Sequence, residues 1–113
     1  MDIQKVNKNI GLFDFYTNLL TNKQRHAFTL YYFDDLSLGE IAQELGTSRQ
    51  AVYDIIKRTE KLLNAYEQKM QLYHKFLEDL QIIEEIKDNL ETSELQTYKR
   101  TKIIQLLEQL ISK

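Results

Sequence analysis

Cysteine and proline are both missing from this chain of 113 residues, and glycine occurs only three times. Without cysteine the chain has no disulfide bonds, no thiol catalysis and none of the usual structural zinc sites, and it suits a reducing cytoplasm. Proline and glycine are the residues that most often interrupt helices, so their scarcity predicts long helices. A chain of this length holds one small domain and an appendage rather than two large cores.

Long hydrophobic runs and an excess of one charge are missing as well. No apolar run approaches the roughly 20 residues that span a bilayer, and the N-terminal segment lacks the basic start and apolar centre of a signal peptide. We therefore expect no membrane partner. Residues 1–66 carry eight basic and eight acidic side chains, residues 67–113 carry seven and nine, and the net charge is -2. A dedicated DNA-binding domain is more often clearly basic.

Motifs for catalysis are absent too. There is no phosphate-binding glycine loop, no nucleophile elbow and no Ser–His–Asp arrangement, so we expect neither an enzyme nor a cofactor. His26 and His74 have no cysteine or second histidine at ligand spacing, which predicts that there is no metal site.

A two-helix pattern lies between Leu36 and Lys61. Ser37 with Glu40 three residues later forms the capping box that opens a helix. Gly46 ends this helix, because glycine adopts a left-handed conformation without steric cost, and Ser48 caps the next helix. The positions expected to face inward are Leu38, Ile41, Ala42, Leu45, Val52, Ile55 and Ile56. Two short helices around a glycine turn, with a small alanine where they cross, are typical of a helix-turn-helix.

Two apolar helices are expected before this motif. The first is entered between Asp2 and Asn9, and Thr21 with Gln24 forms the capping box of the second. The second helix is rich in aromatic residues, each of which buries on the order of 150–250 Å². Together these helices supply most of a small core.

The chain after Ser48 has no helix breaker until about Glu91. This predicts a long helix of about 40 residues, about 60 Å long, with two neighbouring apolar seams that repeat every seven residues. The sequence leaves open whether this helix is continuous or bends midway. Ser93 with Gln96 predicts a capping box for a last amphipathic helix, which ends near Ile111 and folds back as a hairpin. A hairpin has a thin core, so we expect two chains to pair as a symmetric homodimer. The candidate dimer contacts are Phe76, Leu80, Ile83, Leu90, Leu106 and Leu110.

The helix-turn-helix pattern and the helices around it also resemble a known family. The run from Leu12 to Leu80 resembles the YlxM family of small bacterial helix-turn-helix proteins. Its segments LTNKQRHAFTLYY and LSLGEIAQELGTSRQAV are similar to region 4 of the sigma-70 class of initiation factors. The resemblance implies an all-helical domain without a wing and a regulatory role connected with the signal recognition particle pathway.

The expected fold is therefore all-α, a sigma region 4-like helix-turn-helix domain continued by a long helix and a C-terminal antiparallel helix. Residues 1–66 are expected to form the helix-turn-helix domain, and residues 67–113 the helical hairpin that serves as a dimerisation arm.

The second helix of the motif carries the candidate nucleic-acid contacts. Arg49, Tyr53 and Lys57 are four residues apart and form one exposed row. Arginine and lysine pair with guanine, glutamine pairs with adenine, and the free amides of a helix start hold phosphate. The candidates are Ser48, Arg49, Gln50, Tyr53, Lys57, Arg58 and Lys61, with Lys23 and Arg25 as flanking cations. Asp54 on the same face repels phosphate, so a merely solvated helix face stays an open alternative.

Two functions follow from these residues. The first is a DNA-binding regulatory protein. The second is an accessory factor of the signal recognition particle, in which the motif binds the particle's protein or RNA and does not read DNA. A basic strip alone does not choose between DNA, RNA and an acidic partner.

Overall fold

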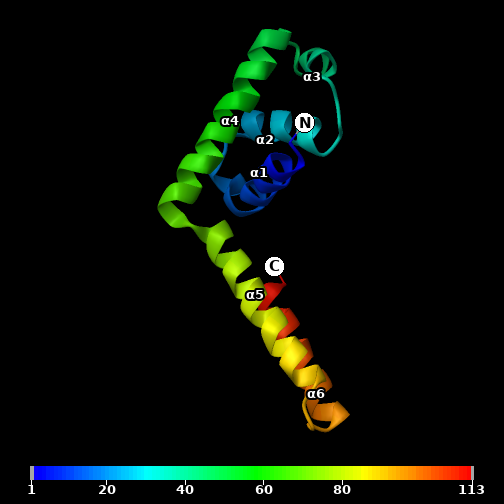
Figure 1. Cartoon of the computed structure of the whole chain (residues 1–113). Coiled ribbons are helices and arrows are strands. Elements are labelled where there is room, and N and C mark those ends of the chain that lie inside the picture. The colour runs from blue at the N-terminus through cyan, green and yellow to red at the C-terminus, as the bar shows by residue number, and fades with distance from the viewer. Residues whose placement is uncertain (1, 113) are drawn as a thin grey trace. The chain divides into compact units, whose positions relative to one another are not determined.

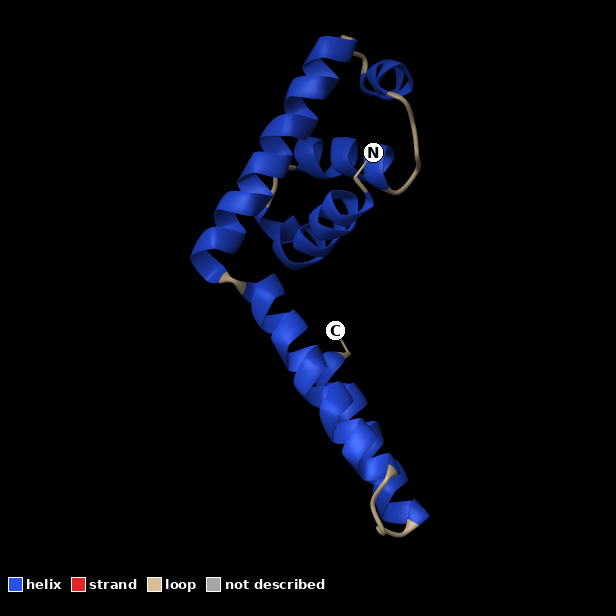
Figure 2. Ribbon diagram, in the orientation of Figure 1, coloured by secondary structure: helices blue, strands red, loops and turns tan. Residues whose placement is uncertain are grey.

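The structure, a computed structural model, describes residues 2–112, and these residues form helices and no strands (Figures 1 and 2). The elements are α1 (Ile3–Tyr16), the 3-10 turn η1 (Thr17–Leu19), α2 (Asn22–Tyr32), α3 (Leu38–Leu45), α4 (Arg49–Met70), α5 (Leu72–Glu91) and α6 (Thr97–Ile111). The all-α fold expected from the sequence is confirmed. The chain divides into two compact units, of which the first ends at Tyr73 and the second begins at His74.

Local capping signals set the helix boundaries of the first unit. Asp2 caps α1, and the predicted capping boxes at Thr21 and Ser37 are both present, with reciprocal side-chain and backbone hydrogen bonds. Gly46 has a φ of 65° and ends α3, as predicted. The Ser48 hydroxyl accepts a hydrogen bond from the Ala51 N–H at 3.1 Å and opens α4.

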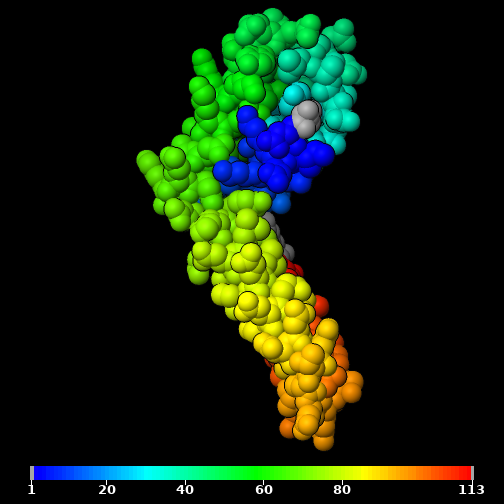
Figure 3. Space-filling view, in the orientation of Figure 1, coloured from blue at the N-terminus to red at the C-terminus, as the bar shows by residue number. Residues whose placement is uncertain are grey.

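Helix α4 packs against α1, α2 and α3, and it contributes to both parts of the core. Its N-terminal half buries Val52 and Ile56 among residues of α2 and α3, and its C-terminal half buries Leu63 among residues of α1 and α2. The space-filling view shows the surface of α1, in blue, next to that of α4, in green (Figure 3). Full burial of one such aliphatic side chain contributes about 1.5–3 kcal/mol. The core residues that pack on α4 are Leu12, Tyr16, Leu20, Ala27, Phe28, Leu30, Ile41 and Ala42.

The long helix expected after Ser48 is divided into two helices, α4 and α5. Helix α4 ends at Met70, and Gln71 takes a left-handed conformation with a φ of 53° before α5 begins. The Tyr16 hydroxyl donates to the Glu67 carboxylate at 2.6 Å and accepts from the Leu72 N–H at 3.1 Å. The same Glu67 oxygen accepts from the Tyr73 N–H at 3.1 Å, so two side chains bind the first amides of α5. These contacts satisfy backbone groups that a continuous helix would have satisfied by itself.

Gly11 makes room for this junction. An added Cβ at Gly11 would lie 2.2 Å from the Tyr73 ring, which is closer than any side-chain contact allows. Tyr73 packs edge-on against Phe15, with ring centroids 6.3 Å apart. Glycine is therefore required at this position for the close approach of Tyr73 rather than for a turn.

The second unit is a helical hairpin in which α6 runs back along α5 (Figure 1). Lys87 of α5 lies 3.5 Å from Glu108 of α6, which joins the two helices. The predicted capping box at Ser93 is wrong, because α6 begins only at Thr97. Ser93 instead donates its hydroxyl to the Leu90 carbonyl, and Arg100 donates to the Ser93 carbonyl at 2.8 Å.

Replacing Tyr16 by Phe tests whether the tyrosine holds the junction between α4 and α5. The change removes two hydrogen bonds and leaves the Leu72 N–H without its acceptor, so we expect a loss of about 1–3 kcal/mol in the free energy of unfolding. Urea denaturation measures it. Tyr98→Phe is the control, because Tyr98 is 75% exposed. Equal stability of the two variants would contradict the role given to the Tyr16 hydroxyl.

Candidate nucleic-acid interface

The turn between α3 and α4 brings the two helices close together. Ala42 is buried at the crossing, where Ile41 and Val52 are fully enclosed. The Gly46 N–H donates to the carbonyls of Ala42 and Gln43, and the Thr47 N–H donates to the Ala42 carbonyl at 3.0 Å. These bonds fix the direction in which α4 leaves the turn.

The side chains proposed as nucleic-acid contacts all lie at the start or on the outer face of α4, and all of them are exposed. They are Ser48, Arg49, Gln50, Tyr53, Lys57, Arg58 and Lys61. The same helix turns Val52 and Ile56 into the core. The structure thus brings the candidates together on one surface, although it holds no ligand that would test their role.

Several of these side chains have partners within the row. Gln50 donates its side-chain amide to the Asp54 carboxylate at 3.1 Å. Lys57 forms an ion pair with Glu60 at 3.3 Å, and its ammonium lies 5.6 Å from the centroid of the Tyr53 ring. Lys57 therefore offsets the negative charge of Glu60 and reduces its repulsion of an anion, whereas the neutral Gln50 amide supplies no positive charge to Asp54.

The two flanking cations differ in role. Arg25 donates to the Thr17 carbonyl at 3.3 Å and to the Asn22 side chain, so it closes the turn between α1 and α2. Lys23 is exposed. Arg25 therefore has a structural role in this turn.

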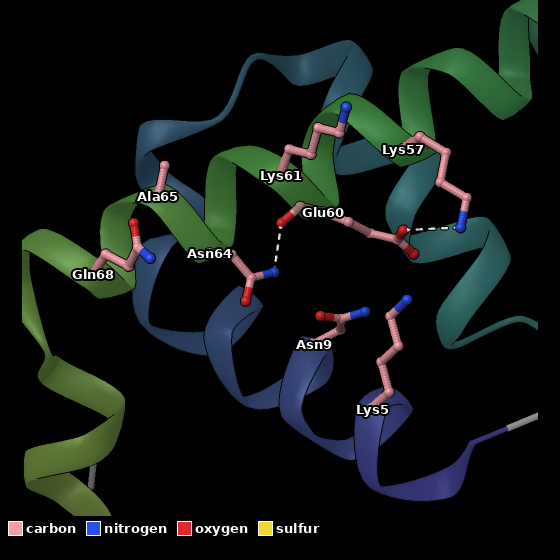
Figure 4. Close-up of a pocket in the computed structure, with 8 residues that line it drawn as sticks. All are labelled: Lys5, Asn9, Lys57, Glu60, Lys61, Asn64, Ala65 and Gln68. Atoms are coloured by element: carbon pink, nitrogen blue, oxygen red, sulfur yellow. Dashed lines mark hydrogen bonds and ion pairs between the residues drawn. The ribbon is translucent and has the colours of Figure 1, made fainter.

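A cleft of about 430 Å³ between α1 and α4 continues this surface (Figure 4). Lys5 and Asn9 line it from α1, and Lys57, Lys61, Asn64, Ala65 and Gln68 line it from α4, with Glu60 between them. Lys57 and Lys61 were expected from the sequence as nucleic-acid contacts, whereas the other residues that line the cleft were not. The spacing of Lys57, Lys61, Asn64 and Gln68 places them on one helical face, whereas their approach to α1 depends on tertiary packing.

Glu60 is the most buried charged residue of the cleft, with 8% of its surface exposed. It accepts a hydrogen bond from the Tyr32 hydroxyl, which in turn accepts one from the Asn9 side-chain amide at 3.0 Å. Burial, and then the hydrogen bond to Glu60, raise the pKa of Tyr32 above its usual range. The network joins α1, α2 and α4 through polar groups.

Among residues 2–112 there is no group of three acidic, histidine or cysteine side chains that could hold a metal ion. No helix in this part of the chain is long and apolar enough to cross a membrane.

The fold and the exposed helix define a protein of the helix-turn-helix class. The model of the family UPF0122, described as "Putative helix-turn-helix protein, YlxM / p13 like", matches residues 3–108, and the chain belongs to this family. The resemblance proposed from residues 12–80 is confirmed, and it extends over nearly the whole chain.

Curated relatives carry the same family name. A UPF0122 protein of Lactiplantibacillus plantarum is 49% identical over 99% of this chain and 95% of its own length. One of Streptococcus gordonii is 56% identical over 76% of this chain and 78% of its own length. One of Bacillus velezensis is 47% identical over 97% and 99%, respectively.

The tyrosine network predicts a loss of stability in alkali. Because the pKa of Tyr32 is raised in the folded state, its contribution is complete below the unfolded pKa of about 10 and is lost as the pH rises through the folded value. We expect the urea midpoint to fall as the pH rises above about 10. The Tyr32→Phe variant should show a shallower fall, and an identical pH profile would contradict the assignment.

Proposed function

We propose that this chain is a DNA-binding regulatory protein that inserts the N-terminal half of α4 into the major groove. The observation that carries this proposal is the exposed row on α4, directly after the turn. In helix-turn-helix proteins the first residues of the second helix contact base edges. Arg49 and Gln50 occupy that place, and their side chains suit guanine and adenine respectively.

The start of α4 supplies the phosphate contact of this proposal. The first amides of a helix have no partners within the helix, and they favour an anion. The Ser48 hydroxyl caps one of these amides, the Ala51 N–H. Arg58 and Lys61 extend the positive surface beyond the base-reading turn.

The cellular role that we propose is transcription regulation in the cytoplasm, connected with the signal recognition particle pathway. It is supported by the resemblance of the sequence to YlxM and to sigma-70 region 4.

A second candidate is an accessory factor that binds the protein or RNA of the signal recognition particle and does not read DNA. The pairing of Lys57 with Glu60 favours it, since that ion pair offsets one of the positive charges of the row.

Replacing Arg49 and Lys57 by Ala tests the proposed reading face. Binding of the wild-type protein to mixed-sequence duplex DNA should weaken as salt rises, with a slope of about 0.9 per phosphate contact. The double variant should bind more weakly and show a smaller slope in fluorescence anisotropy. A matched control, Lys69→Ala with Lys99→Ala, removes the same charge at exposed positions outside the row. If the control and the double variant behave alike, the face is wrongly assigned. Binding to the particle's RNA or protein without duplex binding would support the second candidate.

We also propose that the hairpin pairs two chains as a homodimer. Of the candidate contacts, Leu106 and Leu110 are 51% and 76% exposed, and Phe76, Leu80 and Leu90 are half-buried. Ile83 is only 6% exposed within its own unit, so it supports the hairpin and offers little surface to a second chain.

Replacing Leu106 and Leu110 by Lys should convert dimers to monomers in sedimentation experiments, because two charges would then be buried in an apolar contact. Gln105→Lys with Gln109→Lys adds the same charge to the same helix at exposed polar positions, and it should leave the dimer intact. A wild-type chain that is monomeric at tens of micromolar would refute the homodimer.

A further inference from the structure

We propose that the cleft between α1 and α4 binds a backbone phosphate of the nucleic acid that the row on α4 contacts. This inference rests on the proposed function and adds a second contact, made in part by α1. Its chemistry is that of a phosphodiester held by ammonium and amide groups. Such contacts position a protein on its duplex without reading the sequence.

Charge and hydrogen-bonding groups in the cleft suit this ligand. Lys5 from α1 and Lys61 from α4 are exposed, and neither forms an ion pair with any described residue. Both residues line the cleft, and Figure 4 shows the Lys5 side chain extending from α1 toward Glu60, whereas the Lys61 side chain extends away from α1. The amides of Asn64 and Gln68 lie farther along α4. Lysine ammonium groups are common phosphate ligands. The two walls of the cleft therefore present positive charge from separate helices.

Among residues 2–112, Glu60 is the one acidic residue that lines this cleft. Its carboxylate is held by the Tyr32 hydroxyl and by Lys57, and it is largely buried. Its negative charge is offset by Lys57, so Lys5 and Lys61 stay available to an anion. Glu60 still lowers the affinity that the three lysines would otherwise have for phosphate.

A second hollow, of about 600 Å³, shares Lys5, Lys57 and Glu60 with this cleft. It is lined in addition by Asp2, Asp35 and Glu40, so acidic groups outnumber basic ones there. A phosphate is accordingly favoured on the side of Lys61 and disfavoured on the other side.

The cleft lies farther along α4 than the residues proposed to contact bases. Lys61 follows Tyr53 by eight residues, which corresponds to about 12 Å along a helix. The cleft would therefore add a contact to the sugar-phosphate backbone that is separate from the base contacts at the start of α4.

Replacing Lys5 and Lys61 by Ala tests the inference. We expect the salt slope of duplex binding to fall by about 0.9, which corresponds to the loss of one phosphate contact. The loss should be the same for different duplex sequences. Lys8→Ala with Lys69→Ala is the matched control, since both lysines are exposed on the same two helices but neither lines the cleft. A slope change equal to that of the control would overturn the inference.

Replacing Glu60 by Gln tests the same inference with a variant that should bind the duplex more tightly. The variant keeps an oxygen that can accept from Tyr32 and releases Lys57 from its ion pair, so duplex affinity at low salt should rise about twofold to fivefold. Circular dichroism and urea denaturation establish that the variant is folded. A folded variant that binds more weakly than the wild type would overturn the charge argument.

The outcomes separate the two proposals. Duplex binding that is weakened by Arg49→Ala and not by the change at Lys5 and Lys61 would refute the cleft and leave the reading face in place. Failure of the wild-type chain to bind any duplex would refute both.

Discussion

The buried stripe of α4 is the constraint on which the rest of the first unit depends. Val52, Ile56, Thr59 and Leu63 recur every three or four residues, and all are enclosed. Because the other three helices of this unit pack on this stripe, the stripe fixes which side of α4 remains outside. The exposed row on α4 is therefore a consequence of core packing, and any change that rotated the helix would displace the core and the row together.

The parts of the fold that could be predicted from the sequence are those set by local interactions. Capping boxes at Thr21 and Ser37 and the glycine turn at Gly46 involve residues within four positions of one another, so their patterns are visible in the sequence. The sequence leaves the break after Met70 undecided because the causes of the break are distant. Tyr16 lies more than fifty residues away from Leu72. Gln71 carries no signal either, since glutamine favours helices. The late start of α6 has a more local cause, because Arg100 donates to the carbonyl of Ser93, seven residues earlier, and holds the loop that precedes the helix.

The candidate site likewise has one part that could be predicted from the sequence and one part that could not. The row on α4 could be predicted, because a helical period assigns inward and outward positions without knowledge of the partners. The cleft could not, since it exists only where α1 lies against α4. Glu60 illustrates the difference. In the sequence it is one more negative charge near the row, whereas in the structure it is a buried acceptor that joins Tyr32 to Lys57.

The net charge of this chain is a poor guide to the charge near α4, because it does not show where the acidic and basic side chains lie. Residues 1–73 carry nine basic and nine acidic side chains, and residues 74–113 carry six and eight, so the excess of acid lies wholly in the second unit. Within the first unit, at least five of the acidic side chains are bound internally, namely Asp2, Glu40, Asp54, Glu60 and Glu67. Hydrogen bonds and ion pairs offset their fields close to the surface. No ion pair among the described residues involves Arg49, Arg58 or Lys61. These three side chains extend from α4 into solvent. A ligand that approaches α4 therefore meets these three cations beside the exposed carboxylate of Asp54, although the unit as a whole is neutral.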